Sequence, residues 1–115
     1  MKWEKPSEDL MGILEAKLEN VKCEKRKMFG QYAFFLNGNM FTGVFQSRIF
    51  LRLSSESKKK IMEQYPQISH FEPRKGQVMQ EYIEIPSKLV ENEDIFSELL
   101  DSSINYANRL PSKKK

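Results

Sequence analysis

The stretch Lys27–Leu53, KMFGQYAFFLNGNMFTGVFQSRIFLRL, decides the fold of this 115-residue chain. Two apolar runs flank Asn37-Gly38. Both of these residues tolerate the positive φ of a type I′ turn, so the pair is the strongest short hairpin signal that a sequence offers. Gln46-Ser47 marks a second, weaker turn. The stretch therefore predicts three consecutive antiparallel strands.

The two turns also predict which side chains share a face of the sheet. With two-residue loops, the facing pairs are Leu36 and Asn39, Phe34 and Phe41, Phe45 and Arg48, and Thr42 and Leu51. Paired residues share a face, and side chains alternate along each strand. We assign a smooth, aliphatic face to the core beneath the helices: Ala33, Phe35, Met40, Thr42, Val44, Ile49, Leu51 and Leu53. The opposite face is aromatic with two arginines: Tyr32, Phe34, Phe41, Gly43, Phe45, Arg48, Phe50 and Arg52. A slip of one residue would exchange the faces of a strand.

The flanking segments predict three helices and two further strands. We expect helices at residues 7–20, 55–65 and 93–110, and strands at 68–72 and 77–85, from the caps, prolines and apolar spacing. The segment 21–27 is interpreted as a solvated connector, with a local anion or phosphate contact as the alternative. The order α-β(3)-α-β(2)-α predicts a two-layer α+β fold, a five-stranded antiparallel sheet with helices on one side.

Length and composition restrict the classes of protein. The chain has room for one domain, residues 1–115, with an irregular lead at 1–6 and a basic tail at 111–115. The net charge of +3 comes from the lysines at 113–115, so the body is neutral, which argues against a strong DNA-binding surface. No apolar run is long enough to span a membrane, and the start lacks the apolar core of a signal peptide. With Cys23 as the single cysteine, these features favour a cytoplasmic protein.

The chain carries little that suggests catalysis. Its one histidine, His70, and Cys23 are far apart in sequence and belong to no ligand motif, although a Cys–His pair could still meet in space. Serines lack the nucleophile-elbow pattern, and the glycines form no phosphate-binding loop. The sequence therefore predicts no catalytic, cofactor-binding or metal-binding residue, and we do not expect an enzyme.

Several motifs resemble one protein family. The segments in question are Met28-Phe29-Gly30, Asn39-Met40-Phe41, Arg48–Leu53, Phe71-Glu72 with Gly76, and Tyr82-Ile83-Glu84-Ile85-Pro86. In this order they resemble the N-terminal domain of the TfoX/Sxy family, bacterial regulators of natural competence, although Gln31 replaces the second glycine of the family's Met-Phe-Gly-Gly motif. The resemblance covers residues 7–110. It implies a two-layer α+β domain similar to that of secretion chaperones, and no catalytic residues.

Two functions follow as hypotheses. The first is a non-enzymatic protein-interaction module related to these competence regulators and acting in transcriptional regulation, with a homodimer or protein partner held by the sheet face. The candidate contact residues are Phe34, Phe41, Phe45, Arg48, Phe50 and Arg52. The second is weak nucleic-acid binding, in which the same aromatic residues stack on bases and the arginines meet phosphates. A third reading gives this face no function, because Trp3 or a helix covers it.

Overall fold

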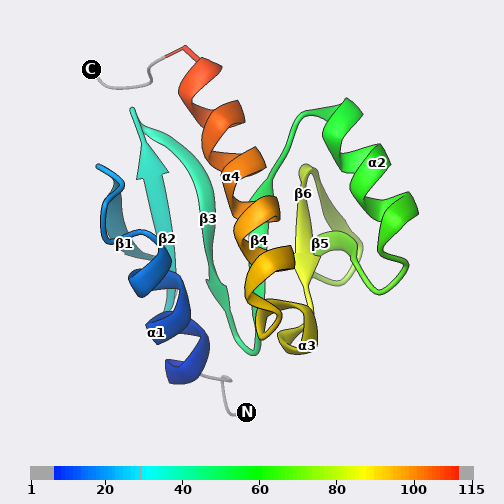
Figure 1. Cartoon of the computed structure of the whole chain (residues 1–115), viewed down its shortest axis with the longest axis horizontal. Helices are drawn as coiled ribbons and strands as arrows, with labels where there is room; N and C mark the ends of the chain where they lie inside the picture. The colour runs from blue at the N-terminus through cyan, green and yellow to red at the C-terminus, as the bar shows by residue number, and fades with distance from the viewer. Residues whose placement is uncertain (1–6, 29, 112–115) are drawn as a thin grey trace.

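The computed structural model describes residues 7–28 and 30–111, and this part of the chain folds into one six-stranded antiparallel sheet covered by helices (Figure 1). The helices are α1 (Glu8–Lys17), α2 (Ser55–Gln64), α3 (Ser87–Val90) and α4 (Glu93–Arg109). The strands are β1 (Glu24–Met28), β2 (Gln31–Leu36), β3 (Asn39–Phe45), β4 (Arg48–Arg52), β5 (Ser69–Arg74) and β6 (Gln77–Ile85). Their order across the sheet is β1-β2-β3-β4-β6-β5. Trp3, the lead at 1–6, Phe29 and the lysines at 113–115 lie outside the described residues.

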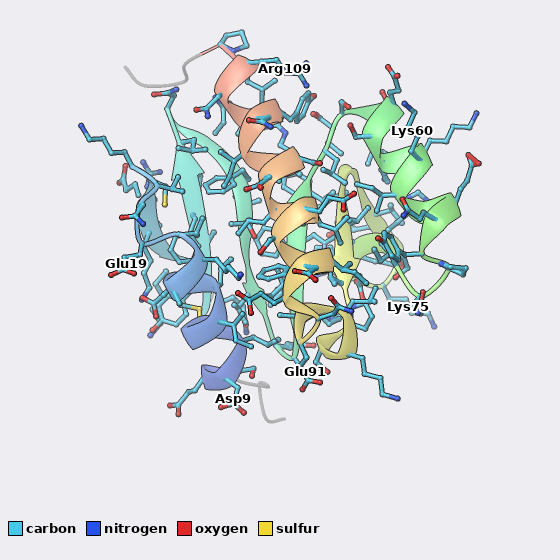
Figure 2. All side chains as sticks on the ribbon, in the orientation of Figure 1. Asp9, Glu19, Lys60, Lys75, Glu91 and Arg109 are labelled. Carbon is cyan, nitrogen blue, oxygen red and sulfur yellow. The ribbon has the colours of Figure 1, made fainter. Side chains whose placement is uncertain are left out.

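The helices pack on one side of the sheet, which confirms the predicted two-layer α+β class. In Figure 1, α4 crosses the middle of the sheet, with α1 over the β1–β2 side and α2 beside β6. Figure 2 shows that the charged side chains of Asp9, Lys60 and Arg109 lie on the outer surface of these helices, where they are exposed. Apolar residues from the four helices join one core with the sheet: Leu14 of α1, Ile61 of α2, Val90 of α3, Phe96 of α4 and Ile83 of β6. No helix in the described part of the chain combines the length and apolar character that a membrane crossing requires.

The sheet has six strands rather than the predicted five, because the charged segment before Met28 is a strand. β1 pairs with β2 in antiparallel register, from Glu24 opposite Phe35 to Met28 opposite Gln31. The interpretation of this segment as a solvated connector was therefore wrong. An edge strand borders only one neighbour, and charged side chains on it keep other chains from pairing there. Such a strand needs no apolar alternation, so the pattern used to find strands was missing.

The central hairpins form at the predicted turns. Asn37 and Gly38 both have positive φ (51° and 81°), as a type I′ turn requires, and Leu36 pairs with Asn39 as predicted. Gln46 also has positive φ (56°), and the predicted pairs of β3 with β4 are confirmed. The predicted pair of Phe34 with Phe41 is wrong, since a β-bulge shifts the register and pairs Phe34 with Thr42. One strand then carries an extra residue, and its alternation breaks at that point.

The remaining boundaries differ from the prediction by a few residues. α1 ends at Lys17 rather than near residue 20, while Ser7, Ser54 and Asn92 cap α1, α2 and α4 with their side chains. The short helix α3 after Pro86 was not predicted, since a single turn gives no periodic signal. Pro73, expected in the β5–β6 turn, lies within β5 instead, where an edge strand tolerates the missing amide.

Candidate interaction face

The side of the sheet opposite the helices, which we call the open face, carries its own apolar cluster. Four of its side chains are buried: Ala33, Phe50, Phe71 and Tyr82. Four half-buried ones pack against them: Phe35, Met40, Phe45 and Met79. These residues come from β2, β3, β4, β5 and β6, so the cluster extends across most of the sheet. On a sheet face exposed to solvent, polar residues would occupy these positions. The apolar and aromatic composition of the open face therefore requires an explanation.

The structure places the six candidate contact residues on different sides of the sheet. Phe45, Phe50 and Arg48 lie on the open face, as predicted from the β3–β4 turn. Arg52 pairs with Tyr82 of this face, and its guanidinium carbon lies 5.8 Å from the Tyr82 ring and 6.0 Å from the ring of Tyr106 of α4. Phe34 and Phe41 belong to the core beneath the helices, at 4% and 0% exposure, so their assignment to the candidate face was wrong. The β-bulge causes this error, because Phe41 and Thr42 together oppose Phe34 and the alternation counted from β4 reverses there.

The same bulge moves residues from the predicted core to the open face. Ala33, Phe35 and Met40 were assigned to the aliphatic core but lie in the open-face cluster. Tyr32 moves the other way and packs against the helix-side core. Val44, Ile49, Leu51 and Leu53 lie in the core as predicted, so the error is confined to β2 and the start of β3.

Phe71, Met79 and Tyr82 lie on the open face but were not predicted there. The alternation of β6 was a usable signal for Tyr82, since Ile83 and Ile85 point to the core. No such signal existed for Phe71. β5 contains two register irregularities, one on each side of Phe71, so its facing side cannot be counted from the turn.

The rings of the open face meet across several strands. Phe50 of β4 stacks on Phe71 of β5, with ring centroids 4.6 Å apart and planes 13° apart. Phe45 of β3 meets the edge of Phe71 at 5.5 Å. Neighbouring strands lie about 4.8 Å apart, so two rings standing upright from β3 and β5 of a flat sheet would be about 14 Å apart. The side chains of Phe45 and Phe71 therefore lean toward each other across the strands between them.

Gly43 leaves room for the ring of Phe50 to lie against its backbone. A Cβ atom at Gly43 would come within 2.5 Å of Cζ of Phe50 and closer still to the backbone oxygen of Tyr32. Gly43 and Phe50 are directly paired across β3 and β4. The ring thus covers the backbone of the glycine, which explains both the absence of a side chain there and the 4% exposure of Phe50.

Three arginines on or beside this face share one arrangement. Arg26, Arg48 and Arg52 have their guanidinium carbons 4.5, 5.4 and 5.8 Å from the ring centres of Phe35, Phe45 and Tyr82, respectively. Each is also ion-paired at 2.9–3.0 Å, with Glu24, Glu84 and Glu81. Cation–π contact and a carboxylate partner hold each guanidinium against its ring. The positive charge that phosphates would need is therefore already compensated within the chain.

Two hydroxyls bond the carbonyl oxygens beside the bulge. The Tyr82 hydroxyl donates to the oxygen of Met40 (2.9 Å) from the open face, and the Ser103 hydroxyl of α4 donates to the oxygen of Phe41 (3.0 Å) from the helix side. Burial raises the pKa of the Tyr82 phenol, so the group stays a protonated donor at neutral pH. Both faces of the sheet therefore help to hold the bulge in place.

The titratable groups that suggested chemistry do not come together. Cys23 precedes β1 and His70 lies on β5, and these two strands are the opposite edges of the sheet. A nucleophilic pair of Cys23 and His70, which the sequence had left possible, is thus excluded. Burial raises the pKa of the Cys23 thiol, which favours the unreactive protonated form. Within residues 7–28 and 30–111, no three His, Cys, Asp or Glu side chains are grouped to hold a metal ion.

A shallow depression of about 410 Å³ lies next to Cys23, at the start of β1. Its lining is mixed: Lys22, Cys23, Glu24, Phe35, Asn37 and Gly38. An anion contact, the alternative interpretation of residues 21–27, would need cations without carboxylate partners beside this depression. However, Lys25 pairs with Glu15 of α1 and Arg26 with Glu24, so the structure does not leave these cations for an anion.

The fold and the open face together define a small two-layer α+β domain in which the sheet face opposite the described helices is aromatic. The family model of the TfoX N-terminal domain matches residues 16–107, most of the chain, and the protein belongs to this family. The resemblance drawn from the strand motifs is thereby confirmed. No curated protein matches the chain significantly.

Proposed function

We propose that this TfoX-type domain is a non-enzymatic protein-interaction module that acts in transcriptional regulation, with the open face as its contact surface. The carrying observation is the apolar cluster of the open face, which no helix of the described chain covers. The family membership supports a TfoX-like role. A cytoplasmic location belongs to the same proposal and is supported by the single cysteine.

The edges of the sheet are poor alternatives to the face. β1 presents the exposed cations Lys25, Arg26 and Lys27, and charged side chains on an edge discourage strand addition. β5 contains Pro73, which lacks an amide hydrogen, and its register is irregular. A partner that adds a strand would therefore find neither edge favourable, and the open face is the better surface for a partner.

Nucleic-acid binding is disfavoured by the ion pairs of the arginines. Affinity for nucleic acid rests largely on phosphate neutralisation by free cations. Arg48 makes two bonds of 2.9 and 3.0 Å to Glu84, and Arg52 makes two to Glu81. Fluorescence anisotropy with labelled single- and double-stranded oligonucleotides at low salt should show no binding. A salt-dependent rise that Arg48→Ala abolishes would favour the nucleic-acid function instead.

The test of the interaction module uses two matched substitutions. Met40 and Met62 are both half-buried, but Met40 lies on the open face and Met62 packs on the helix-side core. The full chain and the variants Met40→Glu and Met62→Glu serve as immobilised baits for extracts of the source cells. We expect a polypeptide that the unchanged chain and Met62→Glu retain and Met40→Glu loses. Equal retention by all three baits, or none by any, would contradict the proposal.

A further inference from the structure

The open face leaves a specific set of apolar groups in contact with solvent. Phe50, Phe71 and Tyr82 are buried against one another, and Arg52 lies over the ring of Tyr82. Phe35, Met40, Phe45 and Met79 are only half-buried, although Arg26 lies over the ring of Phe35 and Arg48 over that of Phe45. The half-buried groups thus pack against a buried ring cluster. A contact at this face does not have to order Phe50, Phe71 and Tyr82, because these rings already pack against one another. Methionine adds a side chain that adapts to the surface it meets.

The charges of the open face are balanced within one chain. Arg26 with Glu24, Arg48 with Glu84 and Arg52 with Glu81 each pair one positive with one negative group on or beside this face. A partner with a strong charge of either sign finds no opposite excess here. A twofold axis brings the same surface against itself, so an interface of this kind needs both signs on one surface or none. The open face meets that requirement.

The size of the face agrees with a weak contact between copies. Six strands about 4.8 Å apart span about 24 Å, and strands of five to nine residues are about 16–30 Å long. The face therefore measures about 500 Å² per chain, or about 1,000 Å² for two, which is the lower limit of a specific interface. Two sheets that pack face to face interleave their side chains in a layer about 10 Å thick.

We infer that the open face binds a second copy of this chain, sheet against sheet about a twofold axis, as a weak and reversible dimer. This inference rests on the proposed function and names the partner. The apolar groups, the internal charge balance and the area of the face together favour an identical copy. The internal ion pairs also imply that the dimer responds little to salt, because the interface gains few charges that were unpaired before.

Sedimentation equilibrium of the purified full chain tests this inference, at loads from about 10 µM to 1 mM, a range that covers weak association. We expect the mass to rise from monomer toward dimer, with little change between low and high salt. Met40→Glu should weaken the dimer at least about tenfold, since the axis places two buried carboxylates in an apolar layer. Met62→Glu, the matched control, should dimerise as the unchanged chain does.

Two further measurements keep the test decisive. Concentration-dependent NMR shifts should gather on amides of β2, β3 and β4, with the exposed side of α4 unaffected. If Met40→Glu does not fold, judged by its circular dichroism, Met79→Glu replaces it on the same face. A monomer at every load, or a dimer unaffected by both open-face substitutions, overturns the inference. The bait experiment tests the interaction module separately from the dimer. If the chain is a monomer at every load but still retains a polypeptide that Met40→Glu loses, the dimer is refuted and the interaction module is not.

Discussion

Replacing Gly43 by alanine should destabilise the domain through two contacts at once. The added methyl group would meet the ring of Phe50 and the backbone oxygen of Tyr32. The oxygen is the stiffer obstacle, since Tyr32 lies on the neighbouring strand β2 and its backbone is held by the pairing with β3. Overpacking of this kind costs about 1–3 kcal/mol. For a domain of this size that corresponds to a drop in Tm of about 4–12 °C.

Urea unfolding followed by circular dichroism measures this loss, with Gly12→Ala as the control. Gly12 is exposed on α1 and a Cβ there meets nothing within 4 Å, so the control should gain about 0.5–1 kcal/mol from helix propensity. The two alanine substitutions should thus change stability in opposite directions. Placing Gly43→Ala in a Phe50→Leu background separates the two contacts, because the smaller side chain removes the ring and leaves the oxygen of Tyr32.

We expect most of the cost of Gly43→Ala to persist in the Phe50→Leu background, because the backbone contact remains. If the cost disappears in the Phe50→Leu background, the contact with the ring of Phe50 alone causes the destabilisation. If Gly43→Ala is as stable as the unchanged chain in both backgrounds, β2 and β3 move apart easily. The packing of Phe50 over Gly43, and with it the rigid ring cluster of the open face, would then be refuted.

Three other substitutions or measurements test separate parts of the structure. Tyr82→Phe removes the donor to the oxygen of Met40 and should cost about 0.5–1.5 kcal/mol in urea unfolding, as expected for the loss of one intramolecular hydrogen bond. A negligible cost would mean that water replaces the hydroxyl. The Lys58 ammonium donates to the backbone oxygen of Gln80, and burial lowers the pKa of Lys58. Above that lowered pKa the unfolded chain binds more protons than the folded chain. The free energy of unfolding should therefore rise with pH toward the ordinary lysine pKa of 10.5. In Lys58→Met the contribution of this lysine to the rise in stability between pH 7 and 10 should be absent. The same pH profile in both proteins would argue against a buried amine. Burial also raises the pKa of Cys23, so iodoacetamide at pH 8 should alkylate the folded chain more slowly than the urea-unfolded chain, and equal rates would show a freely accessible thiolate.

The sequence by itself determined the local features of this protein. Asn37-Gly38 set a two-residue hairpin because few other residues tolerate two consecutive positive φ angles, and the pairs of β3 with β4 followed from the turn at Gln46-Ser47. Ser7 and Asn92 marked the starts of α1 and α4 by their capping chemistry. The order of these elements was enough for the α+β class and for the family resemblance.

The tertiary structure alone decided which face carries which side chains. A single bulge opposite Phe34 reversed β2 and the start of β3, so Phe34 and Phe41 entered the helix-side core and Phe35 and Met40 the open face. The sequence around the bulge does not predict it, because the hydroxyls that stabilise it come from distant elements, β6 and α4. The charged strand β1 was equally invisible, since an edge strand is fixed by its neighbour and not by its own apolar pattern. Contacts between distant segments therefore determine which side chains lie on the open face, on which the proposed function rests.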